Sequence, residues 1–159
     1  MIIRDAEPGD AEQMAAILNA IIQVGGTTAI TQLLDGDELR SRMSINSNRS
    51  VWHVAVSAGD VVGFQWAAPH RDLPHDVCDI ATFVKIGGTQ RGIGSKMLAK
   101  TKKKAAALGY REINANIRAD NIGGLTFYSR QGFADHTVKT GVMLSNGLKV
   151  DKIYKRLKL

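Results

Sequence analysis

The chain has 159 residues, of which 44% are apolar and 23% are charged, a balance typical of one globular domain with a sizeable core. Its 21 basic and 15 acidic residues give a net charge of +6, and its single cysteine, Cys78, excludes an internal disulfide and favours a reducing, cytoplasmic compartment. The N-terminus is strand-like, and no apolar run approaches the ~20 residues that cross a bilayer. We therefore expect one domain over residues 1–159, with no signal peptide and no membrane partner.

Two helices are predicted before residue 50. Pro8-Gly9-Asp10 is a helix-starting segment, and apolar residues recur after it at helical spacing until Gly25-Gly26 ends the helix. Asp35-Gly36-Asp37 opens a second, shorter helix that we expect to end near Asn46.

The rest of the chain predicts alternating strands and helices. Residues 52–56 and 61–66 are rich in β-formers, and Gly59-Asp60 between them predicts a hairpin turn. A long central strand is expected over 79–86, followed by a glycine-containing turn and a helix rich in lysine. The remaining expected elements are a strand over 112–117, a helix around Tyr128, and strands near 133–139 and 149–155.

The turn after the central strand, Thr89-Gln90-Arg91-Gly92-Ile93-Gly94-Ser95, is the most informative segment of the chain. A glycine turn between a strand and a helix points several backbone N–H groups at one spot, and the helix N-terminus adds about half a positive charge there. This is typical of a pyrophosphate cradle, although an ordinary strand-to-helix turn stays open on this motif alone. A Walker loop is excluded because Ile93 and Ser95 follow the glycines where a lysine would stand, and a dinucleotide fingerprint is excluded by Met97 at its third small position.

The same turn resembles the coenzyme A loop of the GNAT superfamily of N-acetyltransferases, Arg/Gln-x-x-Gly-x-Gly/Ala, with Thr89 in the first position. A second segment, residues 121–133, resembles the other signature of that superfamily, Asn-x-x-Ala-x-x-x-Tyr-x-x-x-Gly-Phe. The residues in register with it are Asn121, Tyr128, Gly132 and Phe133, and Gly124 replaces the alanine. The resemblance covers nearly the whole chain and implies a single-domain α/β fold: a mixed, mostly antiparallel sheet flanked by helices, with a splayed central strand.

Within the superfamily the chain is similar to the phosphinothricin acetyltransferase group. The similarity rests on residues 19–22 and 25–29, and on Arg71 eight residues before Asp79. Asp79 stands where that group has Glu, and Leu73-Pro74 replaces an Ala-Tyr pair. The resemblance implies acetyl-CoA as the acyl donor, a small-molecule amine such as an amino-acid analogue as the acceptor, Arg71 as a substrate contact and a homodimer.

The resemblance also implies roles for individual residues. Asp79 is the candidate base that deprotonates the amine, and His75 is the alternative because an unperturbed histidine titrates near 6.5. Tyr128 would protonate the departing thiolate, unless it is only a packed helix aromatic. The histidines show no spacing that indicates a metal. The residues expected to contact acetyl-CoA are Val84, Ile86, Thr89, Gln90, Arg91, Gly92, Ile93, Gly94, Ser95 and Asn121.

Other functions stay open on the sequence. The acceptor could be a protein amine, or the chain could be a catalytically silent module that binds acyl-CoA. Nucleic-acid binding rests on the charge alone, because the basic residues are not interleaved with aromatics and no recognised motif is present. We therefore expect no nucleic-acid partner.

Overall fold

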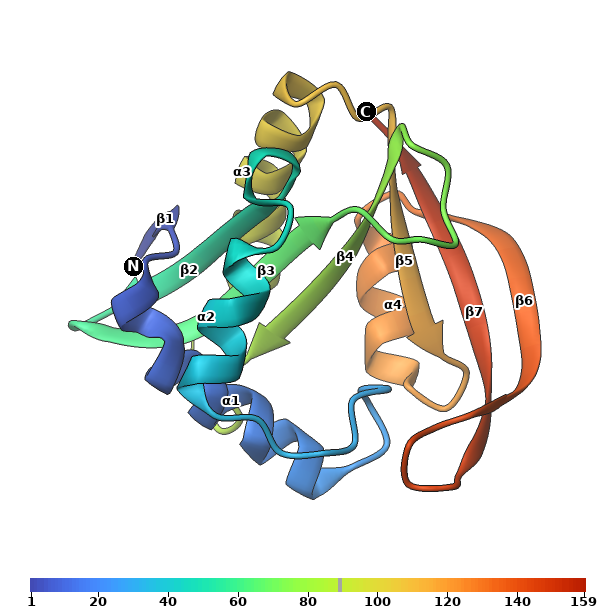
Figure 1. Ribbon diagram of the computed structural model, residues 1–159, viewed down its shortest axis with the longest axis horizontal. Helices are drawn as coiled ribbons and strands as arrows, with labels where there is room; N and C mark the ends of the chain where they lie inside the picture. The colour runs from blue at the N-terminus through green and yellow to red at the C-terminus, as the bar shows by residue number, and fades with distance from the viewer. Residues whose placement is uncertain (89) are drawn as a thin grey trace.

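One seven-stranded sheet, with the strand order β1-β2-β3-β4-β5-β7-β6, organises the chain (Figure 1). The computed structural model describes residues 1–88 and 90–159. In chain order the elements are β1 (Ile2–Asp5), η1 (Pro8–Asp10), α1 (Ala11–Val24), α2 (Gly36–Ser44), η2 (Ser47–Arg49), β2 (Val51–Ser57), β3 (Asp60–Ala68), β4 (Val77–Val84), α3 (Ile93–Ala107), β5 (Glu112–Arg118), α4 (Ile122–Arg130), β6 (Ala134–Met143) and β7 (Lys149–Lys158).

The sheet is mixed and mostly antiparallel, as the sequence predicts, because only β4 and β5 pair in parallel. Their pairing ends at Ile80 and Ala115, although β4 continues to Val84 and β5 to Arg118. Figure 1 shows the two strands diverging toward their arrowheads. The predicted splayed central strand is therefore confirmed, and it is β4.

The helices cover both faces of the sheet. α1 and α2 bury Met14, Leu18 and Leu39 against the face that carries Val54 and Phe64. α3 and α4 cover the opposite face. The buried residues of that second layer include Cys78, Ile80, Leu98, Ala105, Ile113, Ala115 and Tyr128. None of the described helices is long and apolar enough to span a bilayer.

Several predicted boundaries are shifted. The hairpin turn consists of Ala58 and Gly59, both at positive φ, and Asp60 already pairs with Ser57 as the first residue of β3. The central strand covers Val77–Val84 in place of 79–86, since Val77 is buried and pairs with Glu112, whereas Ile86 is 52% exposed beyond the end of the strand. The last two strands are longer than predicted, and each has ten residues.

A buried histidine holds α3 against the sheet. The His53 side chain is almost fully buried; its Nδ1 lies 3.1 Å from Thr101 Oγ1 on α3, and its Nε2 lies 3.3 Å from Asp5 Oδ1. Asp5 also pairs with Lys104 of α3 at 2.6 Å. Burial lowers the pKa of His53; Asp5 opposes this shift, and the nearby Lys104 and Lys100 add to it. The imidazole is therefore held neutral while it anchors the helix.

This anchor makes stability depend on pH. The unfolded chain takes up a proton at His53 near pH 6.5, but the buried ring resists it. The free energy of unfolding should therefore fall as the pH drops below about 6.5. Urea unfolding of the wild type and of His53→Gln, over the range from neutral to mildly acidic pH, measures this. The variant should lose that part of the slope, and an unchanged slope would assign the effect to other groups.

Candidate active site

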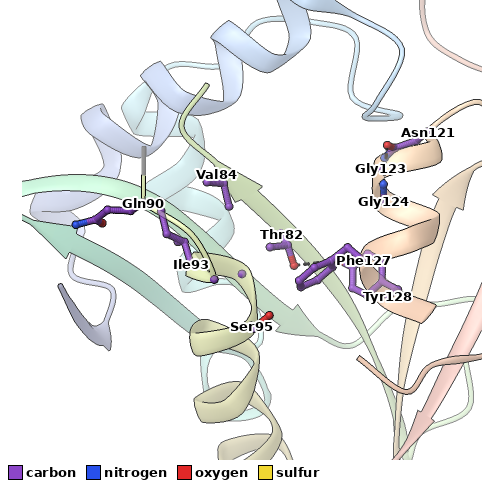
Figure 2. A pocket seen from close by; sticks show the side chains of 12 residues that line it. Thr82, Val84, Gln90, Ile93, Ser95, Asn121, Gly123, Gly124, Phe127 and Tyr128 are labelled. Carbon is purple, nitrogen blue, oxygen red and sulfur yellow. Dashed lines mark hydrogen bonds between the residues drawn. The ribbon is translucent and has the colours of Figure 1, made fainter. Parts of the chain in front are cut away.

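A cleft of about 500 Å³ opens where β4 leaves β5, on the face of the sheet that α3 and α4 cover. Figure 2 shows side chains of β4 and the start of α3 on one side of it and side chains of α4 on the other. The residues that line the cleft are Thr82, Val84, Gln90, Gly92, Ile93, Gly94, Ser95, Asn121, Gly123, Gly124, Phe127 and Tyr128.

The N-terminus of α3 forms one wall of the cleft. Gly92 is the N-cap residue with a φ of 74°, a left-handed conformation that favours glycine, and it offers no side chain to accept from the first-turn N–H groups. Those N–H groups carry the partial positive charge of the helix. A Cβ on Gly94 would lie 3.0 Å from the Phe127 ring, so glycine at this position lets α3 and α4 approach each other. The wall can therefore hold an anionic group close to the backbone.

The N-terminus of α4 is built differently. Asn121 caps this helix, because its Oδ1 accepts from the Gly124 N–H at 2.9 Å. Its Nδ2 donates to the Thr27 carbonyl at 3.0 Å and so ties the loop after α1 to α4. Asn121 lines the cleft, as the sequence predicts, and its side chain already has partners within the protein.

Of the other residues expected to contact the acyl donor, some line the cleft and others do not. Gln90 lines the cleft, and its Nε2 donates to Ser57 Oγ at 2.7 Å. Ile86 lines two neighbouring hollows and not the cleft itself. Arg91 is exposed and is not among the residues that line the cleft. Thr89 lies outside the described residues.

The splayed part of β4 directs backbone donors into the gap. The Lys85 N–H bonds to the Val62 carbonyl at 2.9 Å. Since alternate residues of an antiparallel strand face the partner, the N–H groups of Val84 and Thr82 point away from β3, toward the side that β5 has left. These donors are suited to an oxygen that gains negative charge.

A second pocket, of about 380 Å³, lies on the other face of the sheet and meets the cleft through the gap. The two cavities share Thr82, Asn121 and Tyr128. The loop 27–30 forms one wall of this pocket, and its lining residues include the basic and acidic side chains of Arg42, His70, Asp79 and Arg118. Arg118 pairs with Asp120 at 2.7 Å and donates to the Thr28 carbonyl at 3.1 Å, which fixes that loop.

Asp79 supplies the carboxylate of this pocket. Asn114 on β5 donates to its Oδ1 at 2.9 Å. Burial raises the pKa of Asp79, and the hydrogen bond from Asn114 and the nearby basic side chains of Lys152 and Arg156 only partly oppose this. A carboxylate with a raised pKa is a stronger base than an exposed aspartate.

Cys78 lies beside Asp79 in the chain and points to the opposite face of β4. It is fully buried among core residues, and burial raises the pKa of its thiol to about 12. The thiol therefore stays neutral, and Cys78 is a small core residue.

Arg71 and His75 lie apart from Asp79. Both line a separate hollow of about 390 Å³ with Arg49, and the Arg49 guanidinium donates to the His75 carbonyl at 2.6 Å. His70 lines both this hollow and the pocket of Asp79. The structure therefore brings His70 to Asp79, and it does not bring Arg71 or His75 there.

Sequence reasoning missed the polar face of β5. Asn114, Asn116 and Arg118 share one face of the strand, because successive side chains of a strand alternate. Asn114 contacts Asp79, and the other two residues line its pocket. The alternation of polar residues over 114–118 is a signal that could have identified them.

Tyr128 stands between the two cavities. Its Oη lies 2.9 Å from Thr82 Oγ1, and its ring packs edge-on against Phe127 and Phe133. Burial raises the pKa of the phenol, so that it remains protonated. Within residues 1–88 and 90–159 no group of three or more His, Cys, Asp or Glu side chains could hold a metal ion.

Comparison with known proteins agrees with this geometry. The family model described as "Acetyltransferase (GNAT) family" matches residues 26–133, which include the cleft and Asp79. The chain is 24% identical over 155 residues to the Bacillus subtilis (strain 168) protein named "Putative phosphinothricin acetyltransferase YwnH", and the match covers 95% of this chain and 94% of that protein.

Two solved structures share the whole fold. A ribosomal-protein-alanine N-acetyltransferase from Brucella melitensis matches with a TM-score of 0.90 and 22% identity over 100% of both chains. A phosphinothricin acetyltransferase from Sinorhizobium meliloti, in complex with acetyl-CoA, matches with a TM-score of 0.88 and 20% identity over 99% of this chain and 88% of the other.

The cradle at α3 can be tested with a matched pair of variants. Gly92→Glu places a negative side chain where an anionic ligand would meet the α3 N-terminus, so the affinity for coenzyme A should fall at least 10-fold by calorimetry, a loss of about 1.4 kcal/mol. Gly109→Glu is the control, since Gly109 also has a positive φ and open space but lies just beyond the C-terminal end of α3. Equal affinities of the two variants would exclude the cradle as the binding site.

Proposed function

The chain belongs to the acetyltransferase (GNAT) family, and from this premise we propose that it transfers the acetyl group of acetyl-CoA to a primary amine of a small molecule, by direct attack within a ternary complex. The observation that carries the proposal is the meeting of the two cavities at Thr82, Asn121 and Tyr128. A donor in the cleft and an acceptor in the pocket would approach each other through the gap between β4 and β5 from opposite faces of the sheet.

The cleft provides what an acyl-CoA needs. The first-turn N–H groups of α3 suit its pyrophosphate, because they carry the positive end of the helix dipole and Gly92 leaves them open. The Sinorhizobium meliloti relative was solved with acetyl-CoA bound. In this chain the residues proposed to contact acetyl-CoA are Val84, Gln90, Gly92, Ile93, Gly94, Ser95 and Asn121.

The pocket provides a base. A primary amine near pH 7 is mostly ammonium, so it must lose a proton before its nitrogen can attack. We assign this step to Asp79, whose raised pKa improves its basicity and which lies in the pocket that adjoins the gap. His70 lines the same pocket, where it can hold an anionic group of the acceptor. Arg118 and Arg42 can share this role.

The gap provides the remaining catalytic groups. The Val84 N–H is suited to stabilise the oxygen that gains charge when the nitrogen attacks the thioester carbon. Tyr128 then gives its proton to sulfur as the carbon–sulfur bond breaks and sulfur keeps the electron pair. The new amide nitrogen loses its second proton to water, Asp79 releases the first proton to solvent, and solvent returns a proton to Tyr128. The net products are an amide and a free thiol.

The size of the pocket favours a small acceptor over a protein. Its volume is about 380 Å³, and the loop 27–30 closes one side because Arg118 and Asn121 hold it in place. A thiol-release assay with acetyl-CoA over amino acids, amino-acid analogues, polyamines and N-terminal peptides tests the proposal. Release with the peptides alone would favour a protein amine, and coenzyme A binding without release with any amine would indicate a silent module.

Asp79→Asn tests the base. The variant keeps the shape and can still accept from Asn114 but cannot take a proton, so turnover should fall by about 100-fold. The wild-type rate should decline as the pH drops through the raised pKa of Asp79, and the residual rate of the variant should lack this dependence.

Stability supplies an independent check on the same variant. Because the folded state resists ionisation of Asp79, the wild type loses stability as the pH rises from the ordinary value near 3.8 through the raised pKa. Asp79→Asn should therefore be at least as stable as the wild type at pH 7 in urea unfolding. A variant that is less stable and fully active would assign Asp79 a structural role instead.

Tyr128→Phe tests the acid. The variant keeps the ring and its edge-on contacts, so the affinity for acetyl-CoA should change little while turnover falls 10-fold or more. The loss should shrink with an acetyl thioester of a more acidic thiol, which needs less help to leave. Equal rates for variant and wild type, with chemistry rate-limiting, would remove the phenol from the mechanism.

We further propose a homodimer of single-domain subunits that function in the cytoplasm. The outer strand β6 supports a dimer, because it is a sheet edge and exposes Val138 and Met143, each 58% accessible. A monomeric mass in light scattering at micromolar concentration would contradict the dimer.

A further inference from the structure

A chain of three polar side chains runs from the interior of the sheet to the cleft. Gln65 on β3 is fully buried and lies opposite Thr82 on β4 in the strand register. Its Nε2 donates to Thr82 Oγ1 at 2.9 Å, and Thr82 Oγ1 lies 2.9 Å from Tyr128 Oη. Figure 2 shows the last contact crossing from β4 to α4 at the cleft. The Tyr128 hydroxyl is therefore linked through Thr82 to Gln65, which is buried too deeply for a ligand to reach.

The hydroxyl protons of Thr82 and Tyr128 can be placed in two ways, which differ in which hydroxyl donates to the other. A hydroxyl has one proton and two lone pairs, and the Gln65 amide N–H occupies one lone pair of Thr82. If Thr82 donates its proton to Tyr128 Oη, every group in the chain is used and the phenol proton is free. If Tyr128 donates instead, the Thr82 proton has no acceptor among the described residues. Each arrangement contains two hydrogen bonds, but only the first leaves the phenol proton free to meet a group bound in the cleft.

We propose that Thr82, oriented by Gln65, is a positioning residue for proton transfer from Tyr128: it donates to the phenol oxygen and so turns the phenol proton into the cleft. This inference rests on the proposed acetyl transfer. When the carbon–sulfur bond breaks, sulfur keeps the electron pair and takes the Tyr128 proton, and the negative charge remains on the phenol oxygen. The Thr82 hydroxyl already points at that oxygen and stabilises the charge until solvent reprotonates it.

Burial makes this assistance necessary. The apolar surroundings raise the pKa of Tyr128, whereas the hydrogen bond from Thr82 lowers it. A phenol surrounded by Phe127 and Phe133 gives up its proton reluctantly. The hydrogen bond from Thr82 offsets part of this cost, whereas the negative charge of Asp79 adds to it.

The amide orientation of Gln65 also sets the direction in which hydrogen bonds are donated along these three side chains. Its Nε2 faces Thr82, and its Oε1 is buried with no partner among the described residues. The reversed amide would turn an acceptor toward Thr82, which would draw the Thr82 proton inward and leave Tyr128 donating to Thr82. That reversal would point the phenol proton away from the cleft. The amide orientation at Gln65 therefore determines whether Tyr128 can act as an acid.

The test compares two acetyl donors. Thr82→Val keeps the branched shape and removes the hydroxyl, so turnover with acetyl-CoA should fall about 10-fold. The fall should be much smaller with an acetyl thioester of an aromatic thiol, which leaves readily without a proton. Thr82→Ser, which keeps the hydroxyl, should restore most of the rate. Thr101→Val makes the same chemical change at a buried threonine outside the cleft, and it should alter both rates equally.

A double variant separates positioning from packing. If Thr82 acts through Tyr128, adding Thr82→Val to Tyr128→Phe should cause no further loss, because the proton it directs is already absent. Additive losses, or equal losses with both donors, would overturn the inference and leave the proposed function intact. A wild-type enzyme that releases no thiol with any amine would overturn both. Urea unfolding, in which Thr82→Val should keep the cooperative transition of the wild type, checks that the variant is folded.

Discussion

The divergence of β4 from β5 is the constraint on which the rest of the structure depends. Two parallel strands that paired along their whole length would use their backbone donors in the ladder and leave no opening. Here pairing stops at Ile80 and Ala115, so the N–H groups of Thr82 and Val84 have no strand beside them. The same divergence joins the cavities on the two faces of the sheet. An opening and a set of fixed donors thus arise from one change in strand direction.

Contacts outside the sheet hold this opening in a fixed shape. On one face, Gly94 lets α3 approach the Phe127 ring of α4 closely. On the other face, Arg118 and Asn121 hold the loop after α1 by its carbonyl groups. Farther away, His53 fastens α3 to the sheet and so fixes the helix whose N-terminus lines the cleft. The site is therefore pre-organised by contacts within the protein, at the cost of burying polar side chains such as those of His53 and Arg118.

Much of this was predictable because local signals determine it. Gly25 at a positive φ ends α1, Asp35 caps α2 and Asn121 caps α4, each where the sequence places it. The segments 89–95 and 121–133 could be recognised for the same reason, since each contains a helix N-terminus, which is a local feature. The pocket on the other face was less predictable. Asn114 and Arg118 come from β5 and His70 from the loop after β3, two segments distant in the chain, and only the sheet order brings them together. The resemblance to the phosphinothricin acetyltransferase group implied Arg71 as a substrate contact, and this side chain lines the separate hollow with His75.

Burial has opposite consequences for the two groups that are proposed to move protons, although it shifts both pKa values upward. It raises the pKa of Asp79 and that of Tyr128 alike, since both lose a charge-stabilising solvent. For a base this shift is favourable, because the carboxylate becomes a better proton acceptor. For an acid it is unfavourable, because the phenol becomes a weaker donor. The acid is the group that needs compensation, and the hydrogen bond from Thr82 supplies part of it to Tyr128. Asp79 also has a polar chain behind it, because Asn114 donates to its carboxylate and accepts from Arg156, yet burial outweighs these contacts and keeps its pKa raised.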